Sequence, residues 1–125
     1  MDKPHRRLAA WRQGMTLVRE VYAATAGFPA AERFGLTSQA RRAAVSVVAN
    51  LAEGAARQSP RDYLRFLKVS AGSASELDTL LEISRQAGFL DHALWATLDT
   101  RLAEVDRLLF GLRRHLRRQL PSPNS

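Results

Sequence analysis

Apolar residues recur every three or four positions along most of this chain, which is the spacing of one face of an α-helix. In the first part of the chain, the apolar positions are Leu8, Trp11, Met15, Val18 and Tyr22. Sustained period-two alternation and the Asn-Gly or Asp-Gly pairs of tight hairpins are absent, so no strands are predicted. The pattern predicts an all-α protein.

Prolines, glycines and capping residues divide this pattern into four segments. Thr37 or Ser38 is expected to cap the second helix, because a side-chain oxygen there accepts a bond from a free amide of the first turn. Ser59 followed by Pro60 marks the start of the third helix, and Asp91 that of the fourth. The predicted helices cover residues 5–27, 37–57, 60–87 and 91–118.

Four helices of roughly 20 residues joined by short links predict an antiparallel up-and-down four-helix bundle. Residues 1–120 are expected to form this single domain, and residues 121–125 a flexible tail. No apolar run approaches the roughly 20 residues that span a bilayer. The N-terminal charges are not followed by the apolar stretch of a secretory signal. We therefore expect a cytoplasmic protein with no membrane partner.

The second predicted helix carries a narrow polar stripe on a mostly apolar sequence. In "RRAAVSVVANLAEGAAR", residues 41–57, Ala and Val dominate, but Ser46, Asn50 and Glu53 interrupt them. At roughly 100° per residue, these three fall within an arc of about 80° that they share with other polar residues. The others are Gln39, Arg42 and Arg57.

Two interpretations of this stripe remain open. Polar stripes on helices are most often solvated. Ser and Asn are weak helix formers, however, and solvated helix faces favour longer polar side chains. The second interpretation is a polar network or site completed by Ser73 and Glu76, which share a face of the third helix. In that network Asn50 would donate to Glu76, and Ser46 or Ser73 would bond a carboxylate.

The residue types of this chain exclude most kinds of metal site and catalytic site. The chain has no cysteine, so disulfides and thiolate metal sites are excluded, and its three histidines are too scattered to predict a zinc site. Glu53 and Glu76 form the only carboxylate pair that suggests acid–base catalysis. No nucleophile motif or phosphate-binding loop accompanies them. We predict no catalytic residues, no metal and no cofactor, and hence no enzyme.

Positive charge is unevenly distributed along the chain, whose net charge is +7. Residues 1–75 carry 12 Lys and Arg against 5 Asp and Glu, residues 76–106 carry 2 against 7, and residues 107–125 carry 5 against none. Two basic clusters and one residue of the polar stripe are candidates for binding nucleic-acid phosphates. They are Arg57, Arg61, Arg65 and Lys68; Arg113, Arg114, Arg117 and Arg118; and Arg42.

The last four arginines exceed what a helix C-terminus needs to balance its dipole. Base-specific readout is not predicted, because RNA-recognition aromatics, zinc fingers and KH loops are absent.

The stretches "FPAAERFGLTSQARRAAVSVVANLAEGAAR" and "YLRFLKVSAGSASELDTLLEISRQAGFL" carry many unlike residues in a recognisable order. Through the order of these residues, the chain resembles the four-helix-bundle family first noted in intervening sequences of 23S ribosomal RNA genes. The resemblance extends from about Trp11 to Leu90, and the last helix agrees only in general character. The matching residues are Phe28, Pro29, Glu32, Phe34, Gly35, Leu36, Gln39, Arg42, Ala43, Ser46, Asn50, Ala52, Glu53, Gly54, Arg57, Gly72, Ser73, Glu76 and Leu77.

The resemblance implies a cytosolic bundle that assembles into a homopentamer and has no established enzymatic activity. The family is distantly similar to a basic pentameric accessory protein of diversity-generating retroelements, which binds a reverse transcriptase and nucleic acid. Two functions follow as expectations. The first is an oligomeric bundle that binds RNA or another nucleic acid through its Arg-rich surfaces. The alternative is an oligomeric scaffold that binds a protein partner and has no nucleic-acid role.

Overall fold

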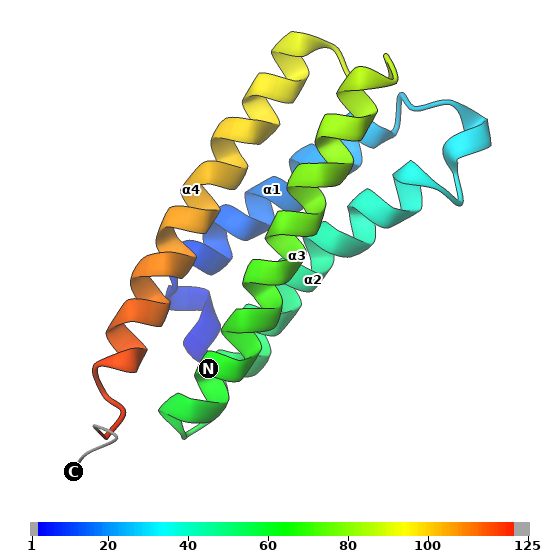
Figure 1. The fold of residues 1–125 in the computed structure, drawn as a ribbon. Coiled ribbons are helices and arrows are strands. Elements are labelled where there is room, and N and C mark those ends of the chain that lie inside the picture. The colour runs from blue at the N-terminus through cyan, green and yellow to red at the C-terminus, as the bar shows by residue number, and fades with distance from the viewer. Residues whose placement is uncertain (1–2, 122–125) are drawn as a thin grey trace.

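The structure, a computed structural model, describes residues 3–121 of the chain. It contains α1 (Ala9–Thr25), α2 (Leu36–Ala55), α3 (Pro60–Gln86) and α4 (His92–Arg117), with short 3-10 helices η1 (Pro4–Arg7) and η2 (Ala30–Glu32). These residues contain no strand, and each long helix packs against its neighbours in a bundle (Figure 1). The predicted all-α bundle is therefore confirmed. Most of the expected tail, residues 122–125, lies outside the described residues.

One apolar core runs along the bundle and receives side chains from all four helices. Leucines from α4 and α3 meet smaller residues from α2, so large and small side chains fill the interior together. Burying each large aliphatic side chain stabilises the fold by roughly 1.5–3 kcal/mol. Fully buried members are Leu17, Val21, Val47, Leu51, Leu67, Leu77, Leu98, Val105 and Leu109.

Helices α2 and α3 make the most extensive contact in the bundle. Gly54 allows this approach, because a Cβ atom there would lie 2.9 Å from Cδ1 of Tyr63 and 3.2 Å from its carbonyl oxygen. Farther along the interface, the fully buried Ser70 donates its hydroxyl to the carbonyl of Val47 at 2.7 Å. Small side chains and a polar bond to the backbone thus hold α2 and α3 close together.

Two of the predicted helix caps are confirmed. The hydroxyl of Ser59 accepts a bond from the amide of Asp62, at 3.4 Å, and a carboxylate oxygen of Asp91 accepts from the amide of Leu94, at 2.8 Å. Both caps satisfy an amide that the first helical turn leaves without a partner. They position the starts of α3 and α4.

The predicted cap of the second helix is wrong. α2 begins at Leu36, so Thr37 and Ser38 lie inside its first turn. The carboxylate of Glu32 accepts a bond from the amide of Leu36 at 3.1 Å. The 3-10 turn of η2 brings this side chain back over Gly35, where a Cβ atom would lie 2.7 Å from it. A residue four positions before the helix therefore replaces the expected local cap.

The first helix begins later than the sequence pattern predicts. Residues 4–7 form η1, and Leu8 is extended, with φ −76° and ψ 126°, so α1 begins at Ala9. η1 contacts both α1 and α2. The break lets the N-terminal segment fold onto the neighbouring helix instead of continuing along the axis of α1.

Candidate nucleic-acid interface

The polar residues of α2 and α3 meet across the interface of these two helices. The hydroxyl oxygens of Ser46 and Ser73 lie 2.7 Å apart, which is a hydrogen bond. The amide nitrogen of Asn50 donates to the carbonyl of Ser46 at 2.9 Å and to its hydroxyl at 3.1 Å. All three side chains are half-buried. The structure thus joins Ser46, Asn50 and Ser73 into one network.

The two glutamates expected in this network do not join it. Asn50 does not donate to Glu76, because its amide reaches Ser46 within its own helix. Glu76 is exposed and lies at the edge of a hollow with Arg42, Ser46 and Ser73. Glu53 is also exposed and pairs with Arg57 at 3.2 Å. The two carboxylates line separate hollows, so they form no acid–base pair.

The two basic clusters of the sequence are brought together at one end of the bundle. α3 begins and α4 ends there, because the two helices run antiparallel, and the N-terminal segment lies at the same end (Figure 1). Side chains from both helices line a hollow of about 330 Å³, which we call the basic hollow. Its basic residues are Arg61, Arg65, Lys68, Arg113 and Arg117.

Little negative charge offsets these side chains. Within residues 3–121, only Arg65 of the five has a carboxylate nearby, with Asp62 at 3.9 Å. Both members of that pair are more than half exposed, so water screens most of their attraction. The remaining four cations of the basic hollow are not paired with any carboxylate of the described chain. The hollow therefore keeps a strong positive charge.

An aromatic ring holds two of the candidate arginines in place. The guanidinium carbons of Arg57 and Arg65 lie 4.8 and 4.6 Å from the ring centroid of Phe66, within the range of cation–π attraction. Phe66 itself is half-buried. This contact aligns Arg57 of the α2 end with the basic residues of α3.

The other candidate arginines lie outside the basic hollow. Arg114 and Arg118 are exposed at the end of α4 and widen the basic surface without lining the hollow. Arg42 lies near the start of α2, at the other end of that helix from Arg57, and helps to line two other hollows. One of the nine candidates is therefore separate from the basic end of the bundle.

Acidic residues gather away from the basic end, along the second half of α3 and the first half of α4. Two of them, Glu82 and Glu104, are paired with arginine. Hydrogen bonds from Arg85 and Gln86 lower the pKa of Glu82 to about 2, and Arg107 lowers the pKa of Glu104. The bundle thus carries positive charge at one end and a net negative charge along the rest of α3 and α4.

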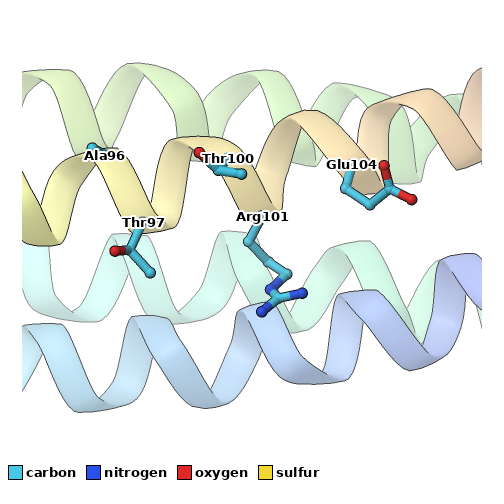
Figure 2. A pocket seen from close by; sticks show the side chains of 5 residues that line it. All are labelled: Ala96, Thr97, Thr100, Arg101 and Glu104. Carbon is cyan, nitrogen blue, oxygen red and sulfur yellow. The ribbon is translucent and has the colours of Figure 1, made fainter.

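A more spacious hollow, between α4 and α1, is not a candidate anion site. Its volume is about 560 Å³, and Ala96, Thr97, Thr100, Arg101 and Glu104 line it beside α1 (Figure 2). Arg101 points towards α1, where it donates to Glu20 and Gln13, each at 2.7 Å. Its positive charge is therefore neutralised inside the bundle. The other lining residues include no histidine or cysteine that would activate a threonine hydroxyl.

A second group of arginines, of which the sequence patterns singled out only Arg42, lies at the opposite end of the bundle. Arg33, Arg41 and Arg42 line a hollow of about 320 Å³ together with Tyr22 and Phe34. These residues come from three elements: the end of α1, the connection, and the start of α2. Helical periodicity carries no signal for such a group. The available signal was Phe34, an aromatic residue in the connection that belongs to no apolar helix face.

Two further structural findings concern chemistry and membranes. Among residues 3–121, no three His, Asp or Glu side chains gather as metal ligands. None of the helices in that part of the chain combines the length and apolar character needed to cross a membrane.

Comparisons with known proteins agree with this fold. A model of the 23S rRNA-intervening sequence protein family matches residues 6–111. No curated protein matches the chain. A solved structure of a protein of unknown function from the S23 ribosomal protein family of Bacteroides thetaiotaomicron is similar, with a TM-score of 0.76 and 18% identity. The match covers 84% of this chain and 98% of that one.

At this identity the similarity to the solved structure shows the fold alone. Neither description points to catalysis. The family match shows more than the fold, because it spans most of the chain, from η1 into the last turns of α4. The resemblance predicted from the sequence is therefore confirmed, and the chain belongs to the 23S rRNA-intervening sequence protein family.

Proposed function

We propose that this protein is a non-enzymatic, homo-oligomeric helical bundle of the cytoplasm that binds RNA or another nucleic acid through the basic end of the bundle. One observation carries the proposal: two basic clusters, 45 or more residues apart in sequence, line a single hollow. Arg61 and Lys68 come from α3, and Arg113 and Arg117 come from α4.

The chemistry of this surface suits a phosphate backbone. Arginine donates to phosphate oxygens through a planar fork of N–H groups, and closely spaced cations displace the counterions around a nucleic acid. Among the described residues that line the hollow, only Leu64 and Leu120 lack a charge, and the other five are cations. None of the described residues that line the hollow is aromatic, which favours recognition of the backbone over recognition of bases.

The oligomeric state is part of the proposal and rests on the family resemblance, which implies five copies. Large apolar side chains on the outer surfaces of the helices agree with further packing, since Val69, Ile83 and Phe110 are 49%, 46% and 61% exposed. A pentamer would present five basic ends, and several weak contacts to one polyanion raise its apparent affinity. Native mass spectrometry tests the number of copies.

The binding test compares two double variants that lose the same charge. Arg61→Ala/Arg117→Ala removes two cations of the basic hollow. Arg19→Ala/Arg107→Ala removes two exposed arginines of α1 and α4 elsewhere on the bundle. Binding of a fluorescently labelled, structured RNA is measured by anisotropy at low salt. We expect the first variant to bind about tenfold more weakly or worse, and the second to stay close to the parent protein.

Equal weakening in the two variants would mean that net charge alone attracts the RNA. Absence of binding by the parent protein at low salt would contradict the proposal and leave a protein-binding scaffold as the better account. Circular dichroism of each variant checks that the bundle still folds.

A further inference from the structure

The hollow at the end of the bundle opposite the basic end combines positive charge with exposed aromatic rings. It lies beside the connection between α1 and α2, which projects from the bundle in Figure 1. Its volume is about 320 Å³, and we call it the arginine–aromatic hollow. Its lining includes Tyr22, Arg33, Phe34, Arg41 and Arg42.

The three guanidinium groups of this hollow are not neutralised. In the described part of the chain, Arg33, Arg41 and Arg42 form no ion pair with a carboxylate. The acidic residue closest to them in sequence, Glu32, is engaged with the amide of Leu36. Glu76 lines a neighbouring hollow with Arg42, but the three arginines leave an excess of positive charge on this concave surface, which attracts an anion.

Two of these arginines are positioned by neighbouring groups. Arg41 donates to the hydroxyl of Thr25 at 2.9 Å and to the carbonyl of Tyr22 at 3.3 Å, and it lies 4.5 Å from the centroid of the Tyr22 ring. Arg33 lies 5.3 Å from the centroid of the Phe34 ring. A guanidinium held in this way loses less conformational freedom when a ligand arrives.

Phe34 contributes almost nothing to the packing of the bundle. Its side chain is 85% exposed, the highest exposure among the large apolar residues of the described chain. The turn that holds it is nonetheless built around contacts of its neighbours, Glu32 and Gly35. A flat ring displayed on a fixed turn beside arginines offers a face for stacking another flat ring.

From these contacts we infer that the arginine–aromatic hollow binds a nucleobase together with its phosphate. The base stacks on Phe34, the phosphate accepts from Arg41 and Arg42, and the hydroxyls of Thr37 and Ser38 line the same hollow as further donors. A free mononucleotide and an unpaired base of a single strand share this chemistry. The inference is independent of the basic end, because the two hollows have no residue in common.

The test follows backbone amide signals by NMR during titration of the full chain with uridine 5′-monophosphate, uridine, and a single-stranded uridine hexanucleotide. We expect shifts concentrated in residues 33–42 with the mononucleotide and much weaker shifts with uridine, which lacks the phosphate. Equal affinity for mononucleotide and hexanucleotide assigns the hollow to free nucleotides. Tighter binding of the hexanucleotide assigns it to single strands.

Variants separate stacking from charge. Phe34→Ala and Arg42→Ala should each weaken binding about tenfold, and both replace exposed side chains without hydrogen bonds in the described chain, so folding should be preserved. Phe110→Ala, which removes another exposed ring from α4, should bind like the parent protein. Absence of shifts in residues 33–42, or unchanged binding by Phe34→Ala, would overturn the inference. This readout does not depend on binding at the basic end, so either proposal can fail alone.

Discussion

The hydroxyls of Ser46 and Ser73 meet at 2.7 Å across the interface of α2 and α3. Asn50 extends this contact by donating to the hydroxyl and carbonyl of Ser46. The residues are half-buried, so their bonds are partly shielded from water. The polar stripe of α2 is therefore in part a structural link between two helices, and its remaining members face solvent.

Removing this link should destabilise the bundle modestly and non-additively. Ser46→Ala and Ser73→Ala should each lower the free energy of unfolding by about 0.5–1.5 kcal/mol, because each loses the same hydrogen bond. The double variant should cost less than the sum of the two, since the bond between the two hydroxyls can be lost only once. Urea denaturation of all four proteins measures this coupling. Strict additivity would show that the two hydroxyls do not interact.

The close approach of α2 and α3 at Gly54 gives a second prediction. A Cβ atom at Gly54 would contact Tyr63 at 2.9 Å and Phe66 at 3.1 Å. Gly54→Ala should therefore push the helices apart and destabilise the fold by roughly 1–3 kcal/mol, as measured by thermal unfolding.

The matched control for this substitution is Gly72→Ala, within α3. Gly72 is exposed, and a Cβ atom at that position would have no neighbouring atom within 4 Å. Alanine there should stabilise the helix by about 0.5–1 kcal/mol, because it restricts the unfolded chain more than glycine does. If both glycine variants behaved alike, helix propensity rather than packing would decide the outcome at Gly54.

The carboxyl of Asp106 gives a pH-dependent prediction. Loss of hydration and the nearby charge of Asp78 raise the pKa of Asp106 in the folded protein. The native state therefore binds this proton more tightly than the unfolded chain, whose pKa is about 3.9. The protonated carboxyl of Asp106 therefore stabilises the fold at pH values below the pKa of the unfolded chain. This stabilisation is lost as the pH rises through the raised pKa of the folded protein.

Asp106→Asn should consequently increase the melting temperature at pH 7, where the unfavourable charge is fully developed. The gain should shrink as the pH is lowered towards 3, since the parent carboxyl is then protonated in both states. Thermal melts of the two proteins across this range provide the measurement. A gain that stayed constant with pH would have to come from something other than the charge of Asp106.

The helices and the starts of α3 and α4 were predictable from local patterns, because apolar spacing and the caps Ser59 and Asp91 act within a few residues. The start of α2 was not, since Glu32 reaches the amide of Leu36 from outside the helix. The break at Leu8 depends on contacts between η1 and α2, which local patterns do not carry.

The candidate sites were only partly predictable, because they too depend on contacts between elements that local patterns do not carry. Both basic clusters were visible in the sequence, but their union in one hollow depends on how α3 and α4 pack. Ser46 and Ser73 were expected to bond a carboxylate, but their hydroxyls bond each other, and Asn50 donates to Ser46 within its own helix instead of to Glu76. The gathering of Tyr22, Phe34 and Arg41 required the path of the connection between α1 and α2.

Contact between the basic hollow and nucleic-acid phosphates should make RNA binding depend strongly on salt concentration. For each phosphate contact on a duplex, the plot of log affinity against log salt concentration steepens by about 0.9. Replacing Arg61, Arg65, Arg113 and Arg117 with alanine together should therefore flatten the slope by about 3–4. An unchanged slope in this variant, with its fold intact, would contradict the account.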